Sequence, residues 1–453
     1  MSEIFRAYDV RGIYPEEINK SVAFKIGAAT ARFLQAKTLV IGEDARIASP
    51  ELRGAVIDAA TKAGAKVYYI GQCTTPLFYF SVNKLKADGG IMVTASHNPK
   101  EYGGLKIVGK GAVSVSATAG LMDIKRISQS DIIFDRSPGD VEEVSILDEY
   151  IKFLIKESGG MPSGVKKLKI VIDASNGMVP IVLSPLLKKM GLDFIPLFFD
   201  IDGTFPNHSP DISKQENLIA LENKVLTTKA DIGFTFDGDA DRLSVVDENG
   251  RKLGADFVTG LLFEAEKGLF KRPKVVYDLR FSKAVRELVG RYGFISPTGH
   301  SFIKENMKKH DADIGGELAG HFDFKEANYA ESAVLAMLRI IALVGKRAKP
   351  ISEIIKPLMK YYNSGEINIE IEEREKVIRA IESLKHKYSY GKVEELDGVT
   401  VDLWNHHPPA GGWWFNARPS NTEPLLRLVV EAETKELMEQ KVAELTQEIK
   451  KTA

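Results

Sequence analysis

The chain has 453 residues, of which 44% are hydrophobic and 27% charged, and its formal net charge is −1. This length and composition predict several globular domains, and the near-neutral charge excludes a chain-wide attraction to nucleic acid or to an anionic membrane. No apolar run approaches the roughly 20 residues of a transmembrane helix, the first residues lack a signal-peptide core, and the lone Cys73 excludes an internal disulfide. We therefore expect a cytoplasmic protein without a membrane or nucleic-acid partner.

A weak internal repeat organises the first three quarters of the chain. In each unit a short apolar strand ends at an aspartate, a helix follows, and a glycine precedes the next strand. This order is typical of a βαβ unit, which predicts mixed, mainly parallel sheets. The first strands are 38–42, 168–173 and 274–278, the helices begin near Ser49, after Pro180 and at Ser282, and the second strands are 65–70, 192–196 and 293–295.

A polar loop follows the apolar strand 90–93. It reads Thr-Ala-Ser-His-Asn-Pro over 94–99, and Pro99 prevents a helix from starting just before it. Ser96 therefore lies beyond the carboxyl end of a strand, where α/β proteins bind their ligands. Adjacency does not make His97 a base for Ser96, because neighbouring side chains usually point apart. Taken alone, the loop is typical of an ordinary polar turn.

A second loop carries three alternating carboxylates between the strand-like segments 232–236 and 243–246. The carboxylates are those of Asp237, Asp239 and Asp241. Like charges packed this closely are unfavourable unless a cation compensates, and oxygen ligands suit Mg²⁺ or Ca²⁺. An EF-hand loop is excluded, because Arg242 occupies the position that needs glycine and the flanks are strands, not helices.

Two further loops in the third unit carry groups that can bind sugars or anions. The glycine-rich segment 315–321 contains Glu317 and His321, a carboxylate and an imidazole that can hold sugar hydroxyls. Gly299 and His300 precede a helix, whose N-terminal amides attract anions. Each of these signals is weak when taken alone.

The last part of the chain has a different pattern, which predicts an α+β domain. Its strands are expected at 367–371, 398–404 and 425–431, and its helices at 374–388 and 435–451. The loop 418–424 joins two strands of this domain and begins with Arg418, whose guanidinium can bind an anion through two N–H groups. Ser420, Asn421 and Thr422 complete a possible anion cradle.

These changes of pattern predict four domains, at 1–143, 144–248, 249–356 and 357–453. The first three are related α/β domains and the fourth is α+β. Linker segments are expected near 142–143, 248–250 and 356–357.

With these loops identified, the whole chain resembles the α-D-phosphohexomutase superfamily, and within it the phosphomannomutase/phosphoglucomutase branch. Three motifs in the family's order carry the resemblance: Thr-Ala-Ser-His-Asn-Pro at 94–99, Asp-Gly-Asp-Ala-Asp-Arg at 237–242 and Arg-Pro-Ser-Asn-Thr-Glu-Pro at 418–424. The resemblance implies four domains around a central cleft, each contributing one loop, with a TATA-binding-protein-like fold for the last. The implied reaction interconverts hexose 1-phosphate and hexose 6-phosphate, of mannose, glucose or both.

The resemblance also implies roles for the matching residues. Ser96 would carry a phosphoryl group, and together with it Asp237, Asp239 and Asp241 would hold Mg²⁺. The catalytic side chains would be Lys106, His300, Arg11 and Arg242, with Tyr8 and His97 beside them. The sugar would contact Gly299, Glu317 and His321, and the phosphate that does not react would be clamped by Arg418, Ser420, Asn421 and Thr422. Hexose 1,6-bisphosphate is the implied intermediate and activator, a phosphosugar is the substrate, and a monomer or homodimer is expected.

Two departures from the family pattern and one match to it distinguish this chain within the superfamily. Ala319 replaces a serine in the sugar loop and Gly103 replaces an asparagine before Lys106, whereas Asn421 favours the mannose/glucose branch. The alternatives are a phosphoglucosamine mutase or a broad phosphohexomutase, a metal-dependent phosphatase with Ser96 as nucleophile, and a binding protein without activity. The mutase is favoured because a pure binder has no need for the serine loop and the acidic loop together.

Overall fold

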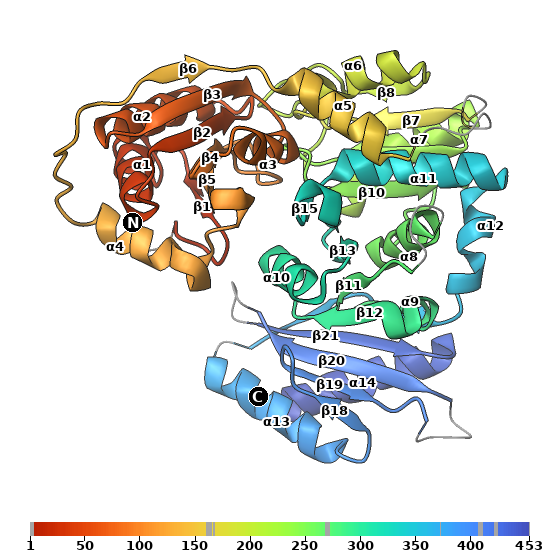
Figure 1. Cartoon of the computed structure of the whole chain (residues 1–453). Helices are drawn as coiled ribbons and strands as arrows, with labels where there is room; N and C mark the ends of the chain where they lie inside the picture. The colour runs from red at the N-terminus through yellow and green to blue at the C-terminus, as the bar shows by residue number, and fades with distance from the viewer. Residues whose placement is uncertain are drawn as a thin grey trace.

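The computed structural model describes residues 4–159, 165, 168–267, 272–371, 373–405, 411–420 and 425–452. Four sheets in chain order define domains I to IV, three α/β domains followed by one α+β domain (Figure 1). One hydrophobic core joins Phe78, Leu183 and Leu262 of the first three domains, whereas domain IV has a core of its own. None of the helices in these described ranges is long and apolar enough to cross a membrane.

Domain I contains a six-stranded sheet in the order β1-β5-β4-β2-β3-β6. Strands β4, β2, β3 and β6 run parallel to one another, and β5 and β1 are antiparallel additions. A Cβ on Gly90 would lie 2.6 Å from the carbonyl oxygen of Val40, so only glycine permits this close strand pairing. The elements are β1 (Val10–Ile13), α1 (Lys20–Phe33), β2 (Thr38–Glu43), α2 (Ser49–Lys62), β3 (Lys66–Gln72), α3 (Thr75–Lys84), β4 (Gly89–Val93), β5 (Tyr102–Gly109), α4 (Met122–Ser128) and β6 (Val141–Glu143).

Domains II and III contain smaller sheets, in the orders β10-β9-β7-β8 and β12-β11-β13-β14-β15. The elements of domain II are α5 (Leu147–Glu157), β7 (Ile170–Asp173), α6 (Pro180–Met190), β8 (Ile195–Leu197), α7 (Ile219–Thr228), β9 (Ile232–Phe236) and β10 (Leu243–Asp247). Those of domain III are α8 (Ala255–Glu266), β11 (Val275–Asp278), α9 (Lys283–Val289), β12 (Gly293–Ser296), α10 (His300–His310), β13 (Ile314–Gly316), β14 (Phe322–Phe324), β15 (Ala330–Glu331), α11 (Ala333–Arg347) and α12 (Ile351–Ile355).

The predicted repeat is confirmed, and an aspartate at the end of each first strand, or directly after it, makes the same turn three times. Asp44, Asp173 and Asp278 are all buried, and each Oδ1 accepts a hydrogen bond from the backbone N–H two residues later, at 3.0, 2.7 and 3.0 Å. The helix expected at 282–291 is shorter, because α9 ends at Val289 and Gly290 has a φ of 52°. Each turn lies at the carboxyl end of its sheet and leads the chain back over it.

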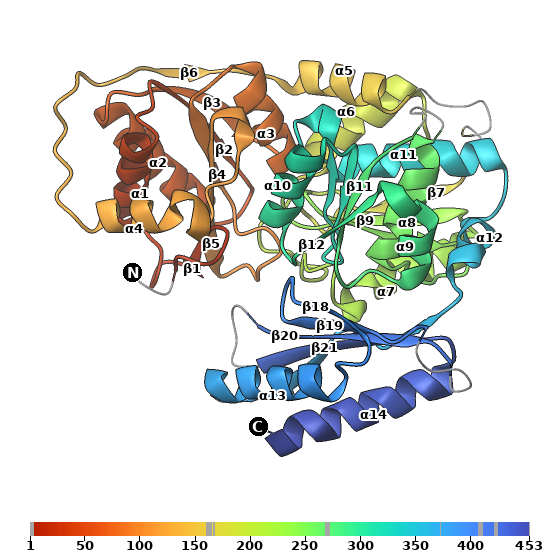
Figure 2. The same ribbon diagram turned by 60° about the horizontal axis from the view of Figure 1, so that its bottom comes forward.

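Domain IV consists of a mainly antiparallel sheet covered on one face by two helices (Figure 2). The sequence predicts its two helices, the bounds of three of its strands and a further strand before the loop at 418, where β20 lies, but β16 and β18 were not among the expected elements. Trp413 of β20 packs in the core of this domain with Leu428 of β21. The elements are β16 (Tyr362–Asn363), β17 (Ile367–Glu370), α13 (Arg374–Lys387), β18 (Lys392–Glu394), β19 (Val399–Asp402), β20 (Trp413–Pro419), β21 (Leu425–Ala432) and α14 (Lys435–Thr452).

The uncovered face of the domain IV sheet lies against domain III (Figure 2). Buried Glu431 of β21 accepts hydrogen bonds from the indole N–H of Trp414, at 2.6 Å, and from the backbone N–H of Lys283 in α9, at 2.8 Å. The guanidinium of Arg286 lies over the Trp414 ring, 4.3 Å from its centroid. These polar contacts position the loops of domain IV beside those of domain III.

Candidate active site

The loop that carries Ser96 is fixed by a single buried arginine. Arg46, only 1% exposed, donates hydrogen bonds to the backbone carbonyls of Ser96, Asn98 and Pro99 at 2.6–2.7 Å. The backbone of Ser96 has a φ of 51°, in the left-handed region that non-glycine residues seldom adopt. Such a conformation persists where its surroundings hold it, and Arg46 supplies that restraint.

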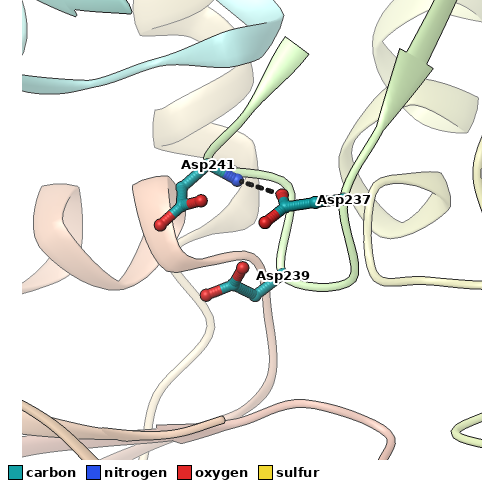
Figure 3. Close-up of side chains that lie close together, drawn as sticks. All are labelled: Asp237, Asp239 and Asp241. Carbon is teal, nitrogen blue, oxygen red and sulfur yellow. Dashed lines mark hydrogen bonds between the residues drawn. The ribbon is translucent and has the colours of Figure 1, made fainter. Parts of the chain in front are cut away.

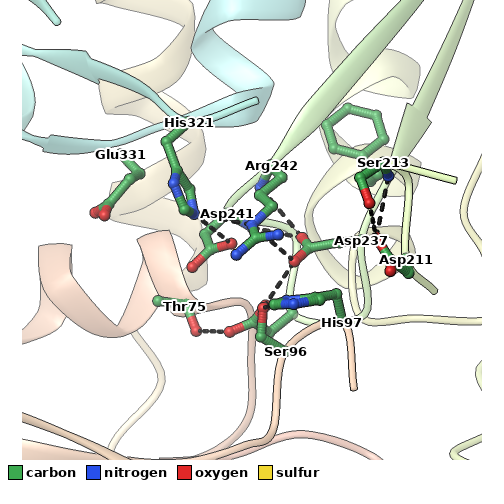
Figure 4. A network of polar contacts seen from close by, with 12 residues as sticks. Thr75, Ser96, His97, Asp211, Ser213, Asp237, Asp241, Arg242, His321 and Glu331 are labelled. Carbon is green, nitrogen blue, oxygen red and sulfur yellow. Dashed lines mark hydrogen bonds and ion pairs between the residues drawn. The ribbon is translucent and has the colours of Figure 1, made fainter. Parts of the chain in front are cut away.

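The hydroxyl of Ser96 points at the acidic loop of domain II. Its Oγ donates a hydrogen bond to Oδ2 of Asp237 at 2.8 Å (Figure 4). Nδ1 of His97 lies 3.3 Å from Oγ of Ser96. Adjacency gave no reason to expect this second contact. Burial, and next the charges of Arg242 and Arg11, hold the pKa of His97 well below its ordinary value.

The three aspartates between β9 and β10 form a compact group of buried oxygens. One carboxylate oxygen from each of Asp237, Asp239 and Asp241 lies within 4.8 Å of the others (Figure 3). Asp237 also orders the loop, because its Oδ1 accepts the backbone N–H groups of Asp241 and Arg242, each at 3.1 Å. Burial and the neighbouring carboxylates raise the pKa of Asp237 well above its ordinary value.

This donor set fits a divalent cation. All the available ligands are carboxylate oxygens, which suit a hard ion such as Mg²⁺. Oδ1 of Asp239 is buried and accepts no hydrogen bond within the described part of the chain, so it is available as a ligand. Oδ2 of Asp239 accepts a hydrogen bond from Thr75 at the start of α3, which ties domain I to the acidic loop.

Three cationic side chains surround the acidic loop. Lys106 of β5 contacts both Asp239 and Asp241, and these carboxylates outweigh burial and raise its pKa, so it is positively charged. Arg242 lies 4.0 Å from Asp237 and donates from Nε to Nε2 of His321 at 3.0 Å. Arg11 pairs with Asp9 at 2.7 Å and contacts Asn98 of the serine loop.

A cavity of about 550 Å³ lies between domains I, II and III, and eight of the predicted residues line it. Its lining includes Tyr8, Arg11, His97, Lys106, Asp241, Arg242, His300 and His321. Glu317 is buried behind His321, with its Oε2 2.8 Å from the Nδ1 atom. Burial raises the pKa of Glu317, but His321 outweighs it and holds the pKa at about 2. The Glu317 carboxylate is therefore ionised.

Gly299 allows domains I and III to approach each other. It has a φ of 128°, and a Cβ at this position would lie 2.1 Å from the hydroxyl oxygen of Tyr8. The Tyr8 ring lies edge-on to His300, with 4.9 Å between the ring centroids. Burial, then Glu317 and Asp397, raise the pKa of Tyr8 to about 12, so its hydroxyl stays protonated.

The predicted phosphate loop lies in domain IV and is not part of the cavity lining. Arg418 is 2% exposed and donates from Nη2 to Glu366 at 2.7 Å. The backbone N–H of Ser420 bonds the carbonyl of Leu425 at 2.9 Å. Asn421 and Thr422 lie outside the described residues. The charges of Arg418 and Asp397 both act on the pKa of Tyr8, a residue of the cavity lining.

Sequence reasoning missed several residues of the site. Arg46 and Arg280 occupy matching places in the repeat, two residues after Asp44 and Asp278, and comparison of the repeats would have found both. Arg280 of domain III donates to Glu366 at 2.8 Å. Glu366 itself had no sequence signal.

Comparison with known proteins covers nearly the whole chain. Four family models match in succession: phosphoglucomutase/phosphomannomutase alpha/beta/alpha domain I at 2–130, domain II at 148–250, domain III at 254–362, and the C-terminal domain at 366–448. A phosphomannomutase of Methanocaldococcus jannaschii is 37% identical and the match covers 98% of this chain and 96% of the relative. A phosphomannomutase/phosphoglucomutase of Pseudomonas aeruginosa is 33% identical, with 97% and 93% covered. A crystal structure of a phosphoglucomutase/phosphomannomutase family protein from Burkholderia thailandensis superposes with a TM-score of 0.87, at 29% identity and with 100% and 98% covered.

Proposed function

This chain belongs to the phosphoglucomutase/phosphomannomutase family of phosphohexomutases, and we propose that it moves a phosphoryl group between O1 and O6 of mannose or glucose through Ser96. The observation that carries the proposal is the 2.8 Å contact of the Ser96 hydroxyl with Asp237, next to His97 and Asp241, which line a cavity between three domains. A phosphoryl group on Ser96 would lie beside Lys106 and the acidic loop. Phosphoryl transfer needs mainly such alignment and charge neutralisation.

In the first half-reaction, O6 of a hexose 1-phosphate attacks the phosphorus on Ser96. The bond from phosphorus to O6 forms, the bond to Oγ breaks and leaves its electrons on Oγ, and the O6 proton passes to His300. Burial lowers the pKa of His300 below its ordinary value, so the imidazole is neutral and can accept this proton. Lys106, which remains charged, stabilises the negative charge that is left on Oγ.

The resulting hexose 1,6-bisphosphate then turns within the cavity, so that its other phosphate faces Ser96. Oγ attacks that phosphorus, the bond from phosphorus to O1 breaks, and O1 takes the proton from His300. The products are hexose 6-phosphate and phospho-Ser96. Arg418 and Ser420, with Asn421 and Thr422, clamp whichever phosphate is not reacting, and added bisphosphate restores the phosphoserine when it is lost.

Asp237, Asp239 and Asp241 would hold Mg²⁺ together with an oxygen of the phosphoryl group on Ser96. When bound, the ion supplies positive charge to the phosphoryl oxygens. The buried carboxylate oxygens support this assignment, because they lie close together and Oδ1 of Asp239 accepts no hydrogen bond within the described ranges.

The test is phosphorus NMR of mannose 1-phosphate and glucose 1-phosphate with the protein, Mg²⁺ and a trace of hexose 1,6-bisphosphate. We expect the 6-phosphates to appear without free phosphate, and we expect S96A to abolish the reaction. Release of inorganic phosphate would indicate a phosphatase instead. Near-normal turnover by S96A would reject the mechanism. Glucosamine 1-phosphate is the third substrate to compare, because Ala319 alters the sugar loop.

A further inference from the structure

A buried carboxylate lies directly behind the imidazole of His300. Glu331, on β15, is 1% exposed, and its Oε1 is 3.1 Å from Nδ1 of His300. Its other oxygen forms an ion pair with Lys304, which lies one turn after His300 on α10. The Lys304 ammonium also lies over the ring of Tyr79, 4.6 Å from the ring centroid. Figure 4 shows Glu331 beside the network that contains His321 and Ser96.

This arrangement places the imidazole between the carboxylate and the cavity. His300 lines the cavity, and Glu331 is not among the lining residues. Tyr8 and His321 flank the His300 ring, with centroids at 4.9 and 5.5 Å. Glu331 can therefore act on a substrate in this cavity through His300. A carboxylate that faces one ring nitrogen determines which nitrogen carries the proton.

A purely structural role does not account for an ionised carboxylate at this position. Glu331 is paired across the sheet with Asp323, which is fully buried, and neither carboxyl oxygen of Asp323 has a hydrogen-bond partner in the described ranges. Burial, and next Glu331, raise the pKa of Asp323 well above its ordinary value, so Asp323 is neutral. Lys304 and His300 outweigh burial and keep Glu331 ionised. Two adjacent acids and a lysine in a dry site contribute little stability compared with apolar residues.

We propose that Glu331 is a positioning residue, which holds His300 with its Nδ1–H toward the carboxylate and its Nε2 free to exchange a proton in the cavity, while Lys304 balances the charge. The proposal rests on the proposed role of His300 in proton transfer. The contact at 3.1 Å lacks the alignment of a hydrogen bond. Such contacts commonly tighten when substrate binds.

The charges around His300 predict how its pKa changes when each neighbouring charge is removed. The groups that face it are Glu331 of β15, Lys304 of its own helix, His321 after β13, Tyr8 of domain I, and more distantly Glu317. Burial lowers the His300 pKa, Glu331 raises it, and Lys304 and His321 lower it. Removal of Glu331 and removal of Lys304 should therefore shift the pKa in opposite directions.

The experiment uses the full chain with ¹⁵N-labelled histidine and an S96A background that cannot turn over. The chain has eight histidines, so the His300 signal is identified by its loss in H300Q. We expect an Nδ1–H tautomer in the S96A protein, a lower His300 pKa in E331Q, and a higher one in K304M. D323N is the matched control, with the same burial and strand pair, and it should leave the His300 pKa unchanged because Asp323 is already neutral. Shifts of the same sign in E331Q and K304M, or no shift, would overturn the proposal.

Activity is measured separately in chains that retain Ser96. We expect E331Q to lower kcat about 10-fold to 100-fold with KM little changed, and E331D to recover part of the loss. If E331Q does not fold, E331D and K304M make the same comparison. Wild-type kcat in H300Q would reject both the role of His300 and the proposal built on it. Absence of mutase activity in the unmodified chain would instead reject the proposed function, and the NMR titration would remain a test of the geometry.

Discussion

The carboxylate of Glu366 accepts a hydrogen bond from Arg418 of domain IV at 2.7 Å and another from Arg280 of domain III at 2.8 Å. Arg427 of β21 lies 3.3 Å from its other oxygen. Burial would raise the Glu366 pKa, but Arg280 and Arg418 hold it below its ordinary value, so the group is an anion. Glu366 thus occupies the guanidinium groups that a phosphate at this loop would need.

We predict that E366Q binds phosphate esters more tightly than the unmodified chain. The amide retains a hydrogen bond to Arg418 but no longer competes for its charge. Because Glu366 is a quarter exposed, the gain should be modest, about twofold to fivefold in the Kd of glucose 6-phosphate. Calorimetric titration of S96A and S96A/E366Q measures it. E370Q, an exposed position on β17, is the control, and weaker binding by E366Q would show that Glu366 organises the arginines instead.

Gly299 gives a second prediction, which concerns the contact between domains I and III. G299A should lower both the Tm and kcat/KM, because the added Cβ overlaps the Tyr8 hydroxyl and the φ of 128° is strained for alanine. In a Y8A background the overlap is absent and only the backbone strain remains, so G299A should lower the Tm by less in that background. A double-mutant cycle on the Tm measures the difference. An equal fall of Tm in both backgrounds would mean that the Tyr8 side chain moves away from the added Cβ without loss of stability.

The pair formed by His208 and Asp173 gives a prediction about pH. Nε2 of His208 lies 3.1 Å from Oδ2 of Asp173, and although burial lowers the His208 pKa, the aspartate outweighs it and raises the pKa above its ordinary value. The pair therefore stabilises the fold fully below the unfolded pKa of about 6.5, and this contribution disappears as the pH rises through the folded pKa. H208Q should lose about 1.5–3 kcal/mol of unfolding free energy in mildly acidic buffer and less in alkaline buffer.

Urea unfolding of both proteins at the two pH values tests this expectation. H386Q, at an exposed position on α13, is the control. A loss in H208Q that stays constant or grows with pH would contradict the assignment of a charged pair.

The parts of the fold that follow from local pattern could be predicted from the sequence. Apolar runs followed by Asp44, Asp173 and Asp278 indicate three strands. Each aspartate marks the end of its strand, because its side chain accepts a hydrogen bond from the backbone of the turn that follows. The edge strand β6 was not predicted, since Val141–Glu143 is exposed and has no apolar run, and it pairs with β3 through its backbone and an ion pair of Glu142 with Lys66. The same residues lie where a linker was expected.

The residues of the candidate site also fall into those that the sequence predicts and those that it does not. Ser96 and the acidic loop follow buried strands, and their residue types indicate phosphate and metal chemistry without knowledge of the fold. Glu331 and Glu366 could not be found, because each acts on a partner in a distant segment or another domain. Arg46 is an intermediate case, since its place in the repeat is visible but its four carbonyl partners are not.

Metal binding at the acidic loop gives the last prediction. Mg²⁺ that binds only the folded chain should raise the free energy of unfolding, by about 2.7 kcal/mol at 100 times its Kd, and this should appear as a higher Tm. D239N removes a buried oxygen that has no hydrogen-bond partner within the described ranges, so Mg²⁺ should raise its Tm much less. D58N removes a half-exposed surface carboxylate on α2 and should respond like the unmodified chain. Because the ion neutralises the phosphoryl oxygens, EDTA should abolish turnover and added Mg²⁺ should restore it. An equal rise of Tm in D239N and the unmodified chain would place the ion elsewhere, and full activity in EDTA would mean that Lys106 and the arginines suffice.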